Sequence, residues 1–381
     1  METLDKFILG LIINPISGMG GAVGLKGTDG QDILLKAIEL GAQPNSINRA
    51  REVLKELKSI KSNLRFLTCP GIMGETVLKE MNFDYTCINH QIFTRMEDIL
   101  DSTPQHTEIA SEIMKNDKNL SLILFVGGDG TARDILKIVD NEKPCLGIPA
   151  GVKVFSGVFS LNPSKASSII IQFLNGEIPL KKSEVLDIDE NKYREGNLIS
   201  KLYGYMLTPY VPDCSQPSKI GTPASDLSNQ ERIAKRIIEI LEKEVYYLLG
   251  PGTTIKAITD HLNQKKTLLG IDLLLNKKII AHDLNERQIL DFIDKKKVKI
   301  IISLTGRQGF LFGRGNLQFS SKVLRTVSIK NLIIVCTKYK LNNIPNQILR
   351  IDTRDPGLDK KLKGLYKVLV DYDELKICKV D

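Results

Sequence analysis

The feature that most constrains this chain is the run Gly127-Gly128-Asp129-Gly130-Thr131, which directly follows an apolar segment at residues 120–126. The apolar segment predicts a buried strand, and the pattern over residues 132–139 predicts a helix. Paired glycines let the backbone approach a ligand because no Cβ intervenes, and the N–H groups at a helix N-terminus favour phosphate. The sequence therefore predicts a phosphate-binding strand–turn–helix, although a turn that merely reverses the chain is the alternative.

Asp129 is the reactive group that this turn offers. A carboxylate held between glycines is expected to face the ligand rather than the core. It could accept a proton from an attacking hydroxyl or help to hold a metal ion such as Mg²⁺. Asp129 is therefore the candidate catalytic residue.

Strands and helices alternate over the first 150 residues. The apolar patterns predict strands at 7–13, 64–68, 85–89 and 120–126, and helices at 33–40, 48–58, 107–115 and 132–139. Such alternation is typical of a parallel sheet with helices on both faces, and ligands bind these sheets at the carboxyl ends of the strands. We expect a Rossmann-like α/β nucleotide-binding domain over residues 1–150.

The chain changes character after residue 150. Segments 184–189 and 201–209 predict antiparallel strands, so we expect a β-rich substrate portion over residues 151–227 that is completed by 345–381. Strand–helix alternation returns over 228–344, where Ser228 and Glu231 form a capping-box pair that predicts the start of a helix. We expect an inserted α/β segment there, and the fold class is α/β throughout.

Composition narrows the partners and the compartment. The 381 residues carry 53 Lys and Arg against 45 Asp and Glu, a net charge of +8, but the lysine clusters are scattered and lack interleaved aromatic residues. Nucleic acid is therefore not an expected partner. No apolar run approaches the roughly 18 residues that span a bilayer, and the six cysteines show no disulfide or zinc spacing. With an acidic N-terminus in place of a signal peptide, we expect a cytoplasmic protein with no membrane partner.

A second glycine-rich stretch follows the first expected strand and the break at Asn14-Pro15. Six glycines, Gly20 and Gly21 among them, fall between residues 18 and 30. Ordering such a loop costs conformational entropy, so we expect a ligand to order it, with Lys26 near a phosphate and Asp29 near Mg²⁺. A flexible structural loop is the alternative.

Two cations lie close to the central motif in the sequence. Lys153 follows the glycine-rich turn 147–151, and Arg133 lies just inside the helix after Thr131. Either could neutralise charge on a transferred phosphoryl group. The alternatives are a surface lysine and an ordinary ion pair.

The last third contains two more glycine-rich turns. Gly252 and Thr253 open a predicted helix after the apolar segment 246–249, which is the geometry of a phosphate-binding helix N-terminus. Arg307 and Arg314 lie in the loop 306–316, and arginines in a glycine-rich loop suit anion recognition. Either turn could instead be a tight turn whose arginines pair with carboxylates.

The central motif resembles the shared mark of the superfamily of NAD kinases, diacylglycerol and sphingosine kinases, and phosphofructokinases. The segments NPISGMGG at 14–21, GGDGTARD at 127–134 and GIPAGVK at 147–153 are similar to the archaeal and bacterial ATP-NAD kinase branch, which is related to acetoin-catabolism protein X. The glycine-rich segments 24–30, 250–254 and 306–316 take part in the likeness, which covers nearly the whole chain.

This resemblance implies an NAD kinase-like fold and activity. The expected reaction is phosphorylation of the adenosine ribose 2′-hydroxyl of NAD to give NADP, with ATP or polyphosphate as the donor and Mg²⁺ required. The family's general base corresponds to Asp129, and its NAD and phosphate loops correspond to Asn14, Gly127, Gly128, Gly130 and Thr131. A homo-oligomer is also implied.

The chain departs from the usual NAD kinases in two places. Residues 147–151 read GIPAG where those enzymes carry a Gly-x-Asn-x-Gly segment, and the Asn-Glu pair that grips NAD has no counterpart near residues 184–187. These departures keep two alternatives open. One is a kinase of another small-molecule or lipid-like hydroxyl, and the other is a sensor that binds nucleotide without turnover.

Overall fold

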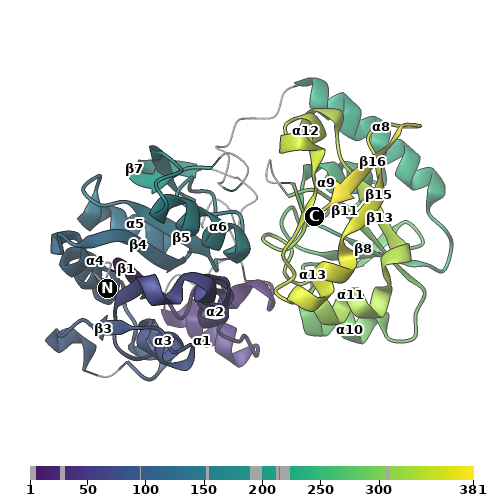
Figure 1. The fold of residues 1–381 in the computed structure, drawn as a ribbon. Coiled ribbons are helices and arrows are strands. Elements are labelled where there is room, and N and C mark those ends of the chain that lie inside the picture. The colour runs from purple at the N-terminus through teal and green to yellow at the C-terminus, as the bar shows by residue number, and fades with distance from the viewer. Residues whose placement is uncertain are drawn as a thin grey trace. The chain divides into compact units, whose positions relative to one another are not determined.

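The computed structural model describes residues 6–25, 31–94, 96–151, 154–188, 200–211, 214, 224–305 and 309–381 (Figure 1). The chain divides into two compact units. Unit 1 comprises Met1–Met19, Gly27–Tyr193 and Asn197–Ser218, and unit 2 comprises Gly20–Lys26, Arg194–Gly196 and Lys219–Asp381. The α/β class expected from the sequence is confirmed in both units.

Unit 1 is built on a five-stranded sheet with the order β3-β2-β1-β4-β5, and every pair of neighbours is parallel. Its strands are β1 Phe7–Ile13, β2 Leu64–Thr68, β3 Tyr85–Cys87, β4 Leu120–Gly127 and β5 Cys145–Pro149. Its helices are α1 Gln31–Glu39, α2 Ser46–Leu57, α3 Glu75–Glu80, α4 Pro104–Asn116, α5 Asp129–Val139 and α6 Pro163–Leu174. The parallel sheet predicted for residues 1–150 is therefore present.

The two faces of this sheet are covered by different helices. Ile13 and Leu124 pack with α2, α3 and α6 on one face, whereas Ile12, Ile123 and Phe125 pack with α4 and α5 on the other. This alternation follows from the two-residue period of a strand. Helix α2, in the connection after β1, and helix α5, which follows β4, thus lie on opposite faces of the sheet. The chain therefore winds in opposite directions from these two neighbouring strands, so the winding of the sheet reverses between β1 and β4.

An antiparallel hairpin covers α5. It consists of β6 Leu180–Ile188 and β7 Ser200–Pro209, as the sequence predicted. Val185 and Met206 are buried in the same core as the apolar side chains of α4 and α5. The hairpin is therefore part of unit 1.

Unit 2 contains a seven-stranded sheet with the order β10-β9-β8-β11-β13-β15-β16. Its strands are β8 Tyr246–Leu249, β9 Asp272–Leu275, β10 Lys278–Ala281, β11 Val298–Ser303, β13 Leu332–Val335, β15 Gly364–Leu369 and β16 Leu375–Val380, and a small separate sheet pairs β12 Phe310–Phe312 with β14 Arg350–Ile351. The helices are α8 Ala224–Ile240, α9 Thr253–His261, α10 Glu286–Ile293, α11 Ser321–Val327, α12 Lys338–Asn342 and α13 Pro356–Leu362. The central strands β8, β11, β13 and β15 are parallel to one another.

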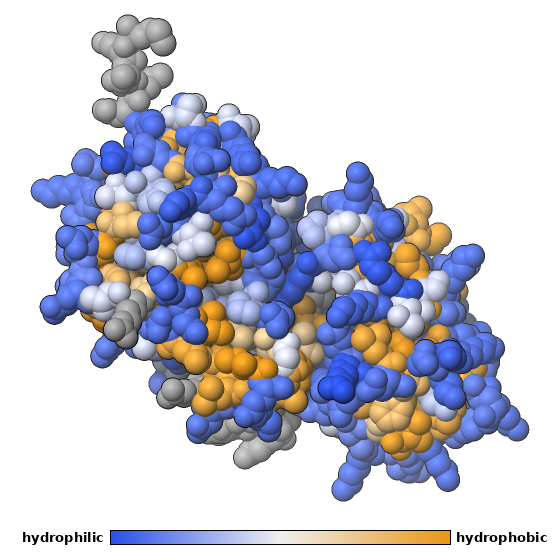
Figure 2. Space-filling view, turned by 90° about the horizontal axis from the view of Figure 1, so that it is seen from below, coloured by the Kyte–Doolittle hydropathy of each residue, from blue (hydrophilic) through white to orange (hydrophobic). Residues whose placement is uncertain are grey.

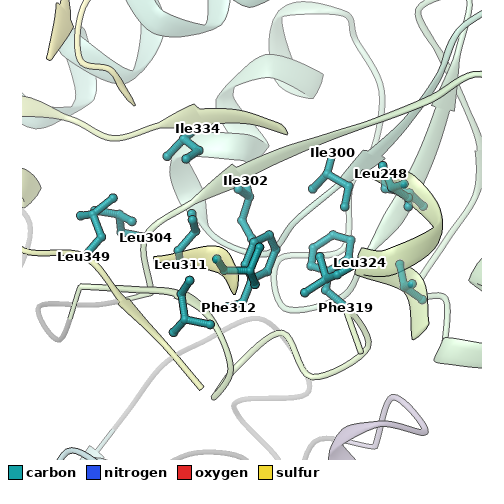
Figure 3. Packing of buried hydrophobic residues seen from close by; sticks show 14 of the residues in the cluster. Leu248, Ile300, Ile302, Leu304, Leu311, Phe312, Phe319, Leu324, Ile334 and Leu349 are labelled. Carbon is teal, nitrogen blue, oxygen red and sulfur yellow. The ribbon is translucent and has the colours of Figure 1, made fainter. Parts of the chain in front are cut away.

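The sheet of unit 2 also buries both faces. Ile300, Ile302 and Phe312 pack with α10, α11 and α13 on one face, part of which is seen in Figure 3. Leu249 and Ile301 pack with α8 and α9 on the other face. Strands buried on both sides explain why these segments read as continuous apolar runs.

Two expectations about the second half need correction. Residues 345–381 do not complete the hairpin of 151–227, because Val335 of β13 pairs with Leu369 of β15 and the last strands therefore extend the sheet of unit 2. The helix expected to begin at Ser228 begins earlier, at Ala224. Ser228 is therefore a residue inside α8 rather than its N-cap, and the next residue, Asn229, joins the helix to Val370 O and Lys338 N through its side chain.

No described helix is long and apolar enough to cross a bilayer. The face shown in Figure 2 is largely hydrophilic, with smaller apolar areas between polar side chains.

The packing of Phe125 yields a test of the fold. Its ring is fully buried and lies edge-on to that of Phe159, with the ring centres 5.1 Å apart. Phe125→Ala should lower the free energy of unfolding by about 3–5 kcal/mol, because it leaves a cavity in the core. Phe7→Ala, the same change at a side chain that is 41% exposed, should cost far less. Chemical denaturation of both variants checks this, and equal losses would contradict the assigned packing.

Candidate active site

The candidate site lies at the carboxyl edge of the unit 1 sheet, where β1 and β4 end side by side. Asn14 follows β1, and its backbone N–H donates to Val126 O at 2.9 Å. Its side-chain Nδ2 donates to Thr131 Oγ1 at 3.0 Å, and its Oδ1 accepts from Ile16 N at 3.2 Å. Asn14 thus fixes the loop after β1 against the first turn of α5.

The glycines after β4 allow three segments to pack closely. A Cβ on Gly127 would lie 2.4 Å from Thr131 Oγ1, and one on Gly128 would lie 3.4 Å from Gly151 Cα. Ala150 N and Gly151 N both donate to Gly127 O, at 2.9 and 3.1 Å. The predicted turn 147–151 is therefore packed directly against the central motif. A glycine is needed at position 127 because Thr131 occupies the space that a Cβ would fill.

Asp129 is the first residue of α5, and Gly130 and Thr131 follow it in the helix. Its side chain is only 5% exposed. Oδ2 accepts from Phe155 N at 2.7 Å, and Oδ1 accepts from Ser156 N at 3.0 Å and lies 2.6 Å from Ser156 Oγ. The carboxylate is thus held in one orientation at the N-terminus of a helix, whose dipole favours a negative charge.

Burial raises the pKa of the Asp129 carboxyl to about 7, although the hydrogen bonds from Ser156 and Phe155 oppose the rise. The negative charge of Asp187 adds to it. A carboxyl with this pKa is partly ionised at neutral pH, and a general base works best when its pKa lies near the working pH. A strongly shifted pKa in a buried carboxyl is also typical of functional sites.

Ser156 connects Asp129 to the hairpin. Its Oγ lies 2.9 Å from Leu186 O and accepts from Leu186 N at 3.0 Å, and the next residue, Gly157, donates from its N–H to Glu184 O at 2.8 Å. A hydroxyl has one proton, so Ser156 donates either to Asp129 or to Leu186 O. The position of β6 therefore controls how strongly the Asp129 carboxylate is stabilised.

Arg133 is engaged within the protein. Its Nη1 lies 2.7 Å from Asp187 Oδ2, and its guanidinium carbon lies 5.6 Å from the ring centre of Tyr203. The structure thus places Arg133 in the ion pair that the sequence left open as the alternative to phosphate contact.

Family models match both parts of the chain. Residues 9–178 match the ATP-NAD kinase N-terminal domain, and residues 242–380 match the ATP-NAD kinase C-terminal domain. The chain belongs to the ATP-NAD kinase family. Membership in this family indicates NAD kinase activity. A comparison with curated proteins finds no match.

Two of the glycines expected in the loop after Asn14 lie in a short turn. Gly20 and Gly21 end the 3₁₀ turn Met19–Gly21, and Glu286 N donates to the next residue's carbonyl, Ala22 O, at 3.3 Å. Four expected residues lie outside the described part of the chain: Lys26, Asp29, Lys153 and Arg307.

Three further candidates belong to unit 2. Gly252 precedes α9 with a φ of +108°, and Thr253 is the exposed first residue of that helix. Arg314 is buried, and its guanidinium carbon lies 4.9 Å from the ring centre of Phe310. Their roles in binding remain predictions.

Ser156 and Phe155 were missed by reasoning from the sequence. Phe155 and Ser156 lie 26 and 27 residues after Asp129 in the sequence, so no local pattern links them to it. The available signal was the position of a Ser-Gly pair at residues 156–157, soon after the turn 147–151. Arg49 was also missed, and it supports the same turn by donating from Nε to Pro149 O at 3.1 Å.

No group of three or more His, Cys, Asp or Glu side chains that could hold a metal ion is present in the described ranges. Both carboxylate oxygens of Asp129 already accept hydrogen bonds from backbone amides.

The raised pKa of Asp129 predicts a pH-dependent stability. In the folded protein the Asp129 carboxyl keeps its proton up to about pH 7, whereas in the unfolded chain it loses the proton near its ordinary pKa of 3.8. The stability that this group contributes is present below about pH 4 and is lost as pH rises through 7. The unfolding free energy of the wild type minus that of Asp129→Asn should therefore fall by up to about 4 kcal/mol between pH 4 and 8, since one pKa unit corresponds to about 1.4 kcal/mol. Urea denaturation across this range checks it, and a difference that is constant with pH would contradict the raised pKa.

Proposed function

We propose that this protein phosphorylates the 2′-hydroxyl of the adenosine ribose of NAD to give NADP, with ATP or polyphosphate as the donor. The observation that carries the proposal is the buried Asp129 carboxylate at the N-terminus of α5. It lies where the winding of the unit 1 sheet reverses, in a chain that belongs to the ATP-NAD kinase family. Ligands bind doubly wound sheets at this point.

In the proposed step, Asp129 acts as the general base. The 2′-hydroxyl oxygen attacks the terminal phosphorus of the donor, its proton passes to the Asp129 carboxylate, and the bond from phosphorus to the leaving phosphate oxygen breaks. Ser156 and Phe155 hold the carboxylate in place through their hydrogen bonds. Holding the base in one orientation removes the need to order it during the reaction.

The backbone around Asp129 is suited to the negative charge of the donor. The first-turn N–H groups of α5 carry the positive end of the helix dipole. Gly128 is the N-cap of this helix, and its lack of a Cβ lets the turn at Gly151 pack against it. We propose that Gly127, Gly128, Gly130 and Thr131 form the phosphate-facing turn, with Asn14 holding it to the loop after β1.

We propose that Mg²⁺ enters with the donor. Magnesium retains several waters and is commonly bound by substrate phosphates together with one or two carboxylates. The absence of an acidic cluster in the described residues agrees with a metal ion that is held mainly by the phosphates.

Asp129→Asn should reduce the rate of NADP formation by at least about 100-fold, because general-base catalysis contributes about 10²–10⁴-fold. Asp134→Asn is the matched control. Asp134 is also buried on α5 but pairs with Lys137 at 3.1 Å, so its variant should retain turnover within a few-fold. The assay follows NADP formed from NAD, Mg²⁺ and either ATP or polyphosphate, and phosphorus NMR verifies the position of the new phosphate.

Near wild-type turnover in Asp129→Asn would remove Asp129 as the base. A wild-type protein that binds NAD but forms no NADP with either donor would contradict the proposed function and would favour another acceptor hydroxyl or a nucleotide sensor.

A further inference from the structure

Unit 2 contains a second point at which a parallel sheet reverses its winding. Strands β8 and β11 are parallel neighbours, with Leu249 opposite Ile301. The helix α9 that follows β8 packs on the same face as α8, whereas α11, which follows β11, packs on the opposite face. Unit 1 shows the same arrangement between β1 and β4. In open α/β sheets the crevice outside such strand ends is where ligands bind.

The connection from β8 to α9 presents unpaired backbone donors at this crevice. Gly252 is the N-cap of α9, and its own N–H donates to Leu268 O at 2.8 Å. The first hydrogen bond within the helix runs from Lys256 N to Gly252 O at 3.0 Å. The N–H groups of residues 253–255 therefore have no acceptor within the helix. A Cβ built on Gly252 meets no atom within 4 Å, so the space beside this turn is open.

Three segments that begin or end at this edge each carry a buried polar atom without a hydrogen-bond partner. Within the described ranges, Thr254 Oγ1, Ser303 Oγ and Asp226 Oδ1 are buried and accept or donate no hydrogen bond. The residues are 0%, 3% and 4% exposed, respectively. An unsatisfied buried polar group is costly, and native proteins rarely keep one without a reason.

The folding of unit 2 places these three atoms on one face of its sheet. Ser303 ends β11 and, by strand alternation, lies on the face where Ile301 packs with α8 and α9. Thr254 is the second residue of α9, and Asp226 lies in the first turn of α8. Both helices begin at the carboxyl edge, since α9 follows β8 directly and Asn229 of α8 bonds to Val370 O beyond the end of β15.

We propose that unit 2 binds a sugar phosphate, free or as part of a nucleotide, at the carboxyl ends of β8 and β11. The phosphoryl oxygens accept hydrogen bonds from the first-turn N–H groups of α9 and from the hydroxyls of Thr254 and Ser303. The carboxylate of Asp226 repels phosphate and accepts instead from a sugar hydroxyl. This site shares no residue with the Asp129 site, so it does not depend on the proposed kinase reaction.

Calorimetric titration of the full-length protein with inorganic phosphate, ribose 5-phosphate and AMP tests the site. Thr254→Val keeps the shape of the side chain and removes the hydroxyl, and it should weaken ribose 5-phosphate binding at least tenfold, as should Ser303→Ala. Thr259→Val is the matched control, because Thr259 is also buried on α9 but its hydroxyl already donates to Lys256 O at 2.8 Å. It should leave binding unchanged.

Two further readouts separate a binding site from a structural defect. Without ligand, Thr254→Val should unfold at the same temperature as the wild type or higher, because it removes an unsatisfied hydroxyl, while the thermal shift caused by ribose 5-phosphate is lost.

Asp226→Asn should reduce the preference for ribose 5-phosphate over phosphate. Tighter binding of AMP would identify the ligand as a nucleotide, and equal binding would identify it as a sugar phosphate. No heat with any probe, or dissociation constants unchanged in both hydroxyl variants, would overturn the proposal.

Discussion

The hydrogen bonds from Ser156 and Phe155 to the buried Asp129 carboxylate are the contacts on which the rest of the site depends. A carboxylate removed from water is costly unless donors surround it. Here the cost is met partly by two amides and a hydroxyl and partly by a pKa that rises to about 7. The balance between these two effects leaves the group able both to lose and to accept a proton near neutral pH.

Several surrounding features are arranged around this carboxylate. The hairpin of β6 and β7 holds Ser156 through Leu186, and Asn14 ties the loop after β1 to Thr131. Gly127 is required because Thr131 occupies the space that a Cβ would fill. The motif is therefore a packing unit as well as a binding turn, and changes at its glycines alter the position of Asp129 before they alter any ligand contact.

The same physical rule operates in both units. Adjacent parallel strands whose following helices lie on opposite faces leave their carboxyl ends uncovered, and helix N-termini point to the opening. In unit 1 this edge holds an ionisable group, Asp129. In unit 2 it holds the hydroxyls of Thr254 and Ser303, which suit binding rather than proton transfer.

The sequence was most informative where structure is local. The strands at 7–13 and 64–68 were predicted with the bounds that the structure has, because a buried parallel strand is a continuous apolar run that ends at turn residues. Asp129 was placed at a strand–turn–helix junction for the same reason.

Features that depend on distant pairing were not predictable in this way. Strand β15 pairs with β13, and no local pattern distinguishes that pairing from one with the hairpin of unit 1. The contact of Ser156 with Asp129 likewise joins residues that are 27 positions apart in the chain. Burial, which sets the pKa of Asp129, exists only once these distant segments have packed.

The most direct test of this account is the pH dependence of kcat for NADP formation, measured from pH 5 to 9 in the wild type and in Ser156→Ala. We expect the wild-type rate to rise with an apparent pKa near 7, the value to which burial raises Asp129. Loss of the Ser156 hydroxyl removes a contact that holds this pKa down, so the rise should move to higher pH in the variant. A rate that does not change over this range, or a profile that is the same in both proteins, would contradict the assignment of Asp129 and Ser156.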